Sequence, residues 1–565
     1  MQLKNESESF ASSTDLETRW EELFVPEGYS LSEGGVFKDK YSPAGKVGQE
    51  VICYTPVIVS GIGKDIDNGE IWYEITFRDA FGDVRTEKAQ MEDLIKRSKV
   101  CKFANKGLNL VDRKAADICE YFNKFIDESA KKLPRKIYVQ TNGWKNGREN
   151  FVLGNMCYTG SEITEVIQIN QEETRGLVKK GSLEQWVRGV EDVICEPITR
   201  FKCYCAVTSV LLRPLDVQSF FVDHTGETST GKTFGVRVAV SMYGDPDELT
   251  LSADSTNTYM ENVASIFTDL PLFADETSIQ TDENLKTLIY IIANEVGKGR
   301  GKKEGGIQSL NRWKTMVFTT GEKPIVDYDG FGGQQVRVIE IQKDMPYMQE
   351  QIMQADDTIK DNHGHVMDLF MKKVFEHRED LQAKFREYRD KFTNSNSNTA
   401  NRVGSTFAAI ALAGELLEEV LEEIGLETRD HLALTMEFFN ETVKEKPVEP
   451  RELKALRFLN DWIEENRSNF VRDEDTGRRP FKICGYQQEG CIDIIPGVAK
   501  GVLKNNSFDQ SAIRKKWVEQ GVMITDKGRQ DYNATHCGEN GETFRNRYWR
   551  IHLAKMQEML EKGTE

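Results

Sequence analysis

The chain has 565 residues, which is too long for a single hydrophobic core, so we expect three or four folded units. Apolar residues make up 39% of the chain and aromatic residues 10%, a composition that excludes a disordered protein. The formal net charge of −18 argues against a protein that coats nucleic acid with its whole surface, although a locally basic channel remains compatible with it.

The ends and the cysteines indicate a soluble protein of the cytoplasm. The opening sequence MQLKNESESFASSTDLETRW lacks the cationic start and apolar run of a signal peptide. No stretch approaches the roughly 18 uncharged apolar residues of a membrane helix, so we expect no membrane contact. The ten cysteines are scattered and form no Cys-x-x-Cys, which is typical of buried thiols. A zinc site from Cys484, Cys491, His536 and Cys537 has spacings that fit no usual ligand pattern.

Residues 1–175 predict a β-rich N-terminal module. The runs VICYTPVIVSG and GEIWYEITFRDAFG are β-branched and aromatic, and Gly, Asp and Asn separate them, as in strands and turns. VDRKAADICEYFNKFIDESAKKL follows with apolar residues three and four apart, which predicts a helix. KIYVQTNGWKNGRENFVLG then resumes the β pattern. The acidic pair Asp65 and Asp67 has no partners in the sequence that would suggest a nuclease or primase site.

Residues 176–345 change to apolar strands that alternate with helices, which predicts an α/β core around a parallel sheet. Residues 346–447 are mostly helical and predict a helical lid region. A charged, Pro-bounded linker then opens the last unit, residues 448–565. The four strands expected in the core are Phe220–Val222, Leu270–Ala274, Thr315–Thr319 and Val336–Ile341.

The sharpest motif is FFVDHTGETSTGKTFGVRVAVSMYG, which fits G-x-x-x-x-G-K-[ST] between an apolar run and a helix-competent stretch. Its glycines let backbone N–H groups surround phosphates, and the following helix adds its positive end. The lysine is suited to the β- and γ-phosphates of ATP, and the final threonine to Mg²⁺. We therefore assign nucleotide binding to Gly226, Thr230, Gly231, Lys232 and Thr233, and call residues 226–233 the phosphate loop.

Two further strands end in polar residues. LPLFADE ends in Asp275, which is expected to hold Mg²⁺ directly or through water, and Glu276, which is expected to activate the attacking water. This carboxylate pair marks an ATPase and disfavours a small-molecule kinase. The strand before TTGEKP ends in Thr319 and Thr320, either of which is placed to bond the attacking water or the γ-phosphate.

Between these strands lies GKGRGKKEGG, residues 297–306, which we call the basic segment. It combines a dense group of cations with glycines that permit a hairpin, and in an acidic chain it is the favoured place for contacts with DNA phosphates. The candidate DNA-binding residues here are Lys298, Arg300, Lys302 and Lys303.

Taken in order, GETSTGKT, DLPLFADETS, ANEVGKGRGKKEGG, TTGEKP and GGQQVRVIEI resemble the AAA+ helicase domain of phages and staphylococcal genomic islands. That family comprises MCM-like replicative helicases and Rep initiators, and the resemblance spans roughly residues 50–430. It implies an AAA+ P-loop core, a homo-hexamer with ATP bound between subunits, and basic hairpins in a central channel. Arg337 and Arg402 match arginines of the family, and by analogy they complete a neighbour's site as finger and sensor; which plays which role stays open. The threonines at the sensor strand depart from the Asn of many AAA+ proteins.

The last unit predicts a small winged-helix-like domain. LKALRFLNDWIEENRSNF is an amphipathic helix, DQSAIRKKWVEQGVMI resembles a recognition helix, and Phe544–His552 reads as a closing strand. DNA binding and protein docking are nearly equal interpretations. The cations expected to line a groove are Arg514, Lys515, Lys516, Arg545, Arg547 and Arg550.

Together these features predict an ATP-dependent hexameric DNA helicase, with ATP and Mg²⁺ as cofactors, that replicates a mobile genetic element and loads itself or binds an origin. Its expected partners are single-stranded and forked DNA, origin DNA and replication proteins. The alternative is an AAA+ switch or remodelling ATPase that assembles on DNA or protein without unwinding.

Overall fold

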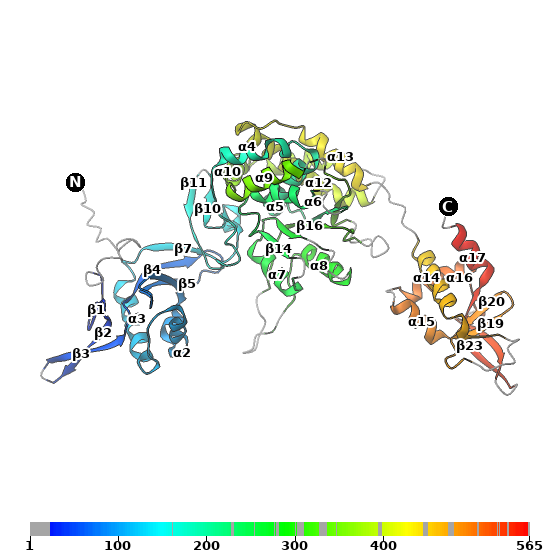
Figure 1. The fold of residues 1–565 in the computed structure, drawn as a ribbon, viewed down its shortest axis with the longest axis horizontal. Helices are drawn as coiled ribbons and strands as arrows, with labels where there is room; N and C mark the ends of the chain where they lie inside the picture. The colour runs from blue at the N-terminus through cyan, green and yellow to red at the C-terminus, as the bar shows by residue number, and fades with distance from the viewer. Residues whose placement is uncertain are drawn as a thin grey trace. The chain divides into compact units, whose positions relative to one another are not determined.

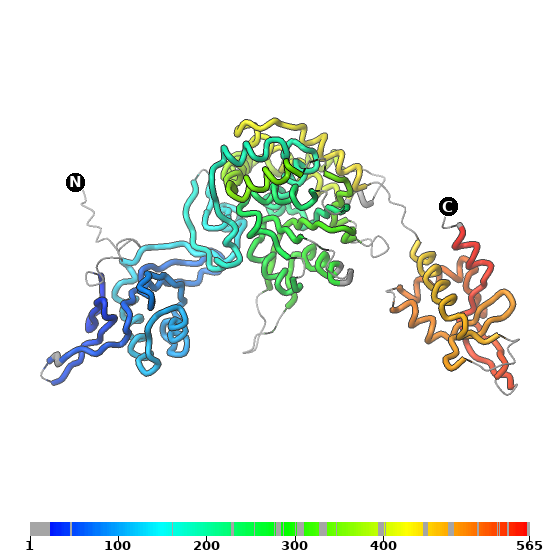
Figure 2. The backbone as a smooth tube through the Cα atoms, viewed as in Figure 1, coloured from blue at the N-terminus to red at the C-terminus, as the bar shows by residue number. Residues whose placement is uncertain are grey.

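The structure is a computed structural model. It describes residues 23–562 except 44, 161, 228–230, 253–254, 276, 278–281, 300, 302–309, 327–335, 346, 348, 394–397, 444–449, 473–479, 506–507, 528, 530 and 539–541. The described residues up to 443 belong to one compact unit and those from 450 onward to a second (Figure 1). Figure 2 follows the backbone through both.

The N-terminal part of the first unit is rich in strands, as expected. A three-stranded antiparallel sheet consists of β1 (Tyr29–Ser32), β2 (Gly35–Ser42) and β3 (Gly45–Cys53). A five-stranded sheet has the order β12-β7-β4-β5-β6. Its strands are β4 (Val57–Asp65), β5 (Ile71–Arg78), β6 (Val84–Gln90), β7 (Arg135–Val139) and β12 (Ile167–Gln168).

The predicted helix is present as α3 (Ala115–Ser129) and follows the short helices α1 (Met91–Ile95) and α2 (Arg97–Val100). Ile118, Phe122 and Phe125 recur every three or four residues on its buried face, which is why the helix packs on the sheets. The Tyr121 hydroxyl donates to the carbonyl of Val57 at 2.7 Å and ties the helix to β4.

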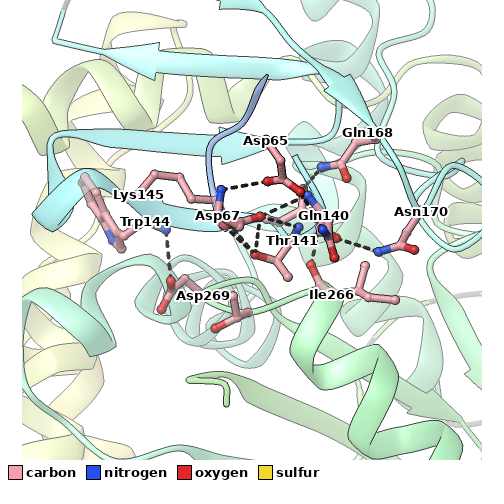
Figure 3. Close-up of polar contacts among 12 residues, drawn as sticks. Asp65, Asp67, Gln140, Thr141, Trp144, Lys145, Gln168, Asn170, Ile266 and Asp269 are labelled. Carbon is pink, nitrogen blue, oxygen red and sulfur yellow. Dashed lines mark hydrogen bonds and ion pairs between the residues drawn. The ribbon is translucent and has the colours of Figure 1, made fainter. Parts of the chain in front are cut away.

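A small antiparallel sheet, β8 (Gly143–Lys145), β9 (Asn150–Leu153), β10 (Met156–Thr159) and β11 (Glu162–Glu165), connects this part to the α/β core. Figure 3 shows the polar network around it. The Lys145 ammonium contacts Asp67 at 2.5 Å, and the backbone N–H of Trp144 donates to Asp269 at 3.0 Å. Gly143 has φ +80°, and a side chain there would collide with Asp269, so only glycine fits this approach. The acidic pair Asp65 and Asp67 thus has structural partners within this network.

Asp269 belongs to this network and lies just before the strand that ends at Asp275. The carboxylate is fully buried and also accepts from Arg213 Nε at 2.9 Å. The backbone N–H of Asp269 donates to the carbonyl of Lys314 at 2.6 Å. Burial raises the pKa of Asp269, and the guanidinium of Arg213 opposes that rise. The starts of two core strands are therefore fixed by residues that lie far away in the sequence.

The α/β core contains a five-stranded parallel sheet in the order β14-β15-β16-β13-β17. The prediction of four buried parallel strands is confirmed. β14 was not expected because it has three residues and no buried side chain. The strands are β13 (Phe220–Thr225), β14 (Thr250–Ser252), β15 (Leu272–Asp275), β16 (Met316–Gly321) and β17 (Val338–Ile341).

Helices from both sides of the phosphate loop pack together. Helix α5 contacts α6 and α12, and α4 contacts α9, so segments before the sheet join those after it. In Figure 1, α7 and α8 lie at the opposite end of this part from α4 and α13. The helices are α4 (Leu183–Ile194), α5 (Pro197–Leu215), α6 (Lys232–Ser241), α7 (Asn257–Ile266), α8 (Asp282–Asn294), α9 (Gln349–Asp361), α10 (Val366–Glu376), α11 (Leu381–Phe392), α12 (Asn398–Glu423) and α13 (His431–Val443).

In its described residues, the second unit combines four α-helices with a mostly antiparallel sheet in the order β18-β19-β20-β23-β21, and β22 pairs with β23. Trp517 and Trp549 are fully buried at its centre. The helices are α14 (Arg451–Glu465), α15 (Pro496–Asn505), α16 (Gln510–Glu519) and α17 (Leu553–Lys562). The strands are β18 (Phe470–Arg472), β19 (Gly485–Gln488), β20 (Cys491–Ile494), β21 (Met523–Ile524), β22 (Tyr532–Cys537) and β23 (Thr543–His552).

Within the described segments, no helix combines the length and the apolar character that crossing a membrane requires.

Candidate nucleotide-binding site and nucleic-acid interface

The phosphate loop runs from the end of β13 to the start of α6. Gly231 has φ +77°, and a Cβ there would lie 3.2 Å from Ile352 and 3.3 Å from Met345, so the position needs glycine. The Lys232 ammonium donates to the carbonyls of Gly226 at 2.5 Å and Glu227 at 2.6 Å. The amine therefore contacts the backbone of the loop, where a phosphate ligand is expected. Thr230 lies outside the described residues.

The two residues assigned to Mg²⁺ lie together. The Thr233 hydroxyl on α6 donates to Oδ1 of Asp275 at 3.2 Å, at the carboxyl end of β15. The Thr320 hydroxyl, at the end of β16, donates to the same oxygen. Hydroxyl and carboxylate oxygens are ligands that Mg²⁺ accepts, so the residues present fit the ion. Glu276 lies outside the described residues.

Thr319 and Thr320 point in different directions, because side chains alternate along a strand. Thr319 donates to Oδ1 of Asp223 at 2.7 Å, and the other oxygen of Asp223 accepts from the backbone N–H of Ile325 at 2.9 Å. Asp223 is fully buried within β13. Of the two candidate sensors, the structure places Thr320 beside Asp275 and Thr319 away from it.

A buried lysine and histidine lie beneath the phosphate loop, and the motif analysis missed both. Lys202 Nζ is 2.7 Å from Nδ1 of His224 and 2.8 Å from the carbonyl oxygen of Lys232. Burial lowers the pKa of Lys202 to about 7 and that of His224 to about 3. The signal that could have revealed Lys202 is a single charge inside the apolar run FKCYCAVTSVLL.

The two family-matched arginines differ in what is described. Arg337 precedes β17, its carbonyl accepts from the N–H of Phe221 at 2.8 Å, and its guanidinium lies 5.2 Å over the ring of Tyr290 on α8. Arg402 belongs to α12, and its side chain lies outside the described residues. Neither of these described contacts of Arg337 involves Lys232.

Paired backbone lies at the start of the basic segment and at Asn311 and Arg312, beyond its end. Val296 and Arg312 form an antiparallel bridge, and the N–H of Gly297 donates to the carbonyl of Asn311 at 2.9 Å. Lys298, at the start of the segment, is exposed. This pairing is what the two ends of a hairpin require. Arg300, Lys302 and Lys303 lie outside the described residues.

In the second unit, α15 and α16 form a helical pair, and α16 presents cations. Asp509 caps α16 by accepting from the N–H of Ser511 at 2.9 Å. Lys515 and Lys516 are exposed on this helix. Arg514 instead forms an ion pair with Asp531 at 2.8 Å and stacks 4.7 Å over Trp549. The helix borders a groove of ≈ 490 Å³ lined by Lys500, Gln510, Ser511, Arg514, Lys515, Val518, Glu519, Thr525 and Arg529.

The hairpin of β22 and β23 carries a second set of cations. Arg545 and Arg547 are exposed. Arg550 is held by Asp493 at 2.6 Å and stacks 3.8 Å over Tyr532, so its charge is used within the fold. Asp493 also contacts Nε2 of buried His536 at 3.0 Å. Across the described ranges, no group of three His, Cys, Asp or Glu side chains is arranged to hold a metal.

Comparisons with known proteins agree with this architecture. Residues 452–555 match the family described as Cch helix turn helix domain, which covers α14 to β23. A solved structure described as "SCCmec type IV Cch - active helicase" matches with a TM-score of 0.62 at 19% identity, over 95% of this chain and 100% of that chain. At that identity the match shows a shared fold.

Two structures of the NrS-1 C-terminal region match less well. One has a TM-score of 0.27 at 9% identity over 81% of this chain and 82% of that chain. The other has a TM-score of 0.28 at 11% identity over 87% of this chain and 95% of that chain. Scores this low carry no argument. No curated protein matches the chain.

A second family model matches residues 29–312, half of the chain, from β1 through the phosphate loop, Asp275 and the basic segment. The chain therefore belongs to the family described as Domain of unknown function (DUF927).

Proposed function

We propose that the chain is an ATP-dependent, hexamer-forming AAA+ DNA helicase that serves the replication of a mobile genetic element. One observation carries the proposal: Thr233, Asp275 and Thr320 meet at the carboxyl edge of a parallel sheet, beside the lysine that opens α6. Ligands bind at this edge in open α/β sheets. A lysine, a hydroxyl and a carboxylate in this arrangement suit the polyphosphate and metal of a nucleotide.

Each side chain has a task in this proposal. Lys232 and the N–H groups at the start of α6 bind the phosphates of ATP. Thr233 and Asp275 hold Mg²⁺, which when bound spreads the negative charge of the phosphates. Glu276, the next residue after Asp275, orients the attacking water and accepts its proton. The Thr320 hydroxyl comes from β16, the strand between β13 and β15, and we assign it the contact with the γ-phosphate or the attacking water.

The hexamer is proposed from the resemblance and from the placement of Arg337. Its guanidinium stacks on Tyr290 of α8 in its own subunit. We therefore propose that Arg337 acts at the nucleotide of a neighbouring subunit; the alternative is that Arg402 has this role. An arginine supplied in trans stabilises the charge of the phosphoryl transition state. This arrangement makes hydrolysis depend on ring formation.

DNA contact is assigned to two places. Lys298, Arg300, Lys302 and Lys303 of the basic segment contact phosphates of the translocated strand, since a motor must hold every sequence equally. The helix-turn-helix domain contacts duplex DNA at an origin through exposed Lys515 and Lys516 of α16 and exposed Arg545 and Arg547 of β23.

The ion pair of Arg514 with Asp531 changes its proposed role from reading DNA to supporting α16. Arg550 has a similar internal role on β23, where Asp493 and Tyr532 hold its guanidinium. The DNA-facing set of this domain is thereby reduced to the exposed cations.

The first test is ATP turnover with and without single-stranded DNA, combined with negative-stain imaging of the protein with ATP and DNA. We expect DNA to stimulate hydrolysis and the images to show six-membered rings. Lys232→Ala is the control, and it should lose turnover in both conditions. A protein that hydrolyses ATP equally well without DNA and forms no rings would instead be the non-unwinding switch or remodelling ATPase.

A further inference from the structure

Helix α5 buries a lysine where apolar side chains are the rule. Lys202 has no exposed surface, and its neighbours Phe201 and Cys203 are also fully buried. A buried amine is unfavourable unless hydrogen bonds replace its lost water. The contacts of Lys202 therefore have to be specific for the fold to retain it.

Those contacts have a defined direction. His224 Nε2 is 2.7 Å from the carbonyl oxygen of Lys343, and because a carbonyl only accepts, Nε2 carries the ring proton. Nδ1 of the neutral ring is then an acceptor, and Lys202 Nζ donates to it at 2.7 Å. The same amine donates to the carbonyl of Lys232 at 2.8 Å. The low pKa of His224, about 3, arises from burial and from the nearby charge of Lys202.

Lys202 thereby joins the two ends of the phosphate loop. His224 is the last residue but one of β13, which enters the loop, and Lys232 is the first residue of α6, which leaves it. The fit is close, because a Cβ at Gly235 on α6 would lie 3.2 Å from Lys202 Nζ and 3.3 Å from Thr199. A side chain at residue 235 would compete with the amine for this space.

We propose that Lys202 is a positioning residue for the phosphate loop: its buried amine fixes His224 and Lys232 at the two ends of the loop and supplies a second positive charge beneath the bound phosphates. This inference rests on the proposed nucleotide binding. It differs from the assignment of Lys232, which lies on the loop itself and donates to the carbonyls of Gly226 and Glu227.

The inference has a consequence that a purely structural lysine would not share. Burial lowers the pKa of Lys202 to about 7, so near neutral pH a large fraction of the amine is uncharged. Phosphates arriving above it favour the charged form, and binding is then linked to uptake of a proton. The groups that face Lys202 are Glu196, Cys203 and Cys205 around α5, His224 on β13 and Lys232 on α6.

The test is titration calorimetry of the full chain with MgADP at pH 6, 7 and 8, in two buffers of different ionisation enthalpy. The wild type should take up almost no proton at pH 6, where Lys202 is already charged, and approach one proton per nucleotide at pH 8. Lys202→Met should remove this uptake and weaken binding at neutral pH, by about 5-fold if nucleotide raises the pKa by one unit and by about 10-fold more for each further unit.

Lys145→Met is the matched control, because Lys145 is also a buried lysine with a lowered pKa but belongs to the network around Asp67. It should leave the proton uptake unchanged. Wild-type binding with the same proton balance at all three pH values overturns the inference even if Lys202→Met does not fold. Equal affinity and uptake in Lys202→Met and wild type, with binding lost in Lys232→Ala, overturn it as well while the nucleotide site stands. Absence of any MgADP binding by the wild type overturns the proposed function and this inference with it.

Discussion

Thr319→Val and Thr320→Val differ by one position along β16, yet they remove hydroxyls that donate to different carboxylates. Thr319 donates to Asp223 at 2.7 Å, and Thr320 donates to Asp275, which also accepts from Thr233. Both threonines are buried, at 1% and 2% exposure, so the two substitutions have nearly the same size, chemistry and environment. They form a matched pair in which only the carboxylate differs.

The structure assigns them different costs. Hydrogen bonds to charged groups contribute roughly 1.5–3 kcal/mol, and Asp223 is fully buried. Because Asp223 keeps its bond from the N–H of Ile325, we expect Thr319→Val to lower the free energy of unfolding by about 1.5–2 kcal/mol. Asp275 is only half-buried and keeps Thr233, so Thr320→Val should cost about 1 kcal/mol. ATP turnover of Thr320→Val should fall about 10²-fold, as when one preorganised hydrogen-bond donor at a reaction centre is removed.

Urea denaturation and steady-state ATP hydrolysis measure the two effects on the same preparations. The assay temperature should be well below the unfolding transition of the less stable variant, so that both remain folded. The reasoning is refuted if Thr319→Val slows hydrolysis as much as Thr320→Val, because the pleat of β16 would then not separate the two roles.

Four further predictions concern the nucleotide site, the arginines, the basic segment and Lys202. Lys232→Ala should abolish ATP hydrolysis without unfolding the chain. Glu276→Gln should still bind ATP and form rings but hydrolyse almost no ATP. Near-normal turnover of Glu276→Gln would show that another group is the general base. Loss of Arg337 or Arg402 should slow turnover by roughly 10³-fold or more, and doping the variant into wild-type protein should inhibit more than in proportion to its fraction if the arginine acts in trans. Neutralising the four cations of the basic segment should weaken single-stranded DNA binding for every sequence and flatten the salt dependence by roughly 0.7 per lost phosphate contact, while basal hydrolysis survives; an unchanged salt slope would exclude the segment as the DNA contact. Burial lowers the pKa of Lys202 from its ordinary value of 10.5 to about 7 in the folded chain, so the unfolded chain binds an extra proton between those pH values. The free energy of unfolding should therefore rise with pH in this range for the wild type and rise less for Lys202→Met, as urea midpoints at pH 7 and 9 would report.

The parts of the site that follow from sequence are local patterns. The phosphate loop is readable because its glycines, lysine and threonine have fixed spacing, and Asp275 because a buried strand ends there. Their meeting at one edge of the sheet follows from the parallel strands, which the apolar runs already predict. The helices α3 and α14 follow from apolar residues at helical spacing.

Other features depend on contacts between distant segments, and no local pattern reports those. The spacing in the sequence does not distinguish Thr319 from Thr320. Side chains alternate along the strand, so only Thr320 contacts Asp275. Lys202 and His224 belong to different elements, and only the fold brings them together. Arg514 looks like a DNA contact in the sequence of α16, but Asp531, seventeen residues later, pairs with it.

The most direct test of the central claim is strand displacement on a forked DNA duplex, with ATP, wild-type protein and the Glu276→Gln variant side by side. The account predicts that the wild type separates the strands only when ATP is hydrolysed, and that Glu276→Gln binds the fork without separating it. Wild-type protein that hydrolyses ATP in the presence of the fork and leaves the duplex intact would contradict the account.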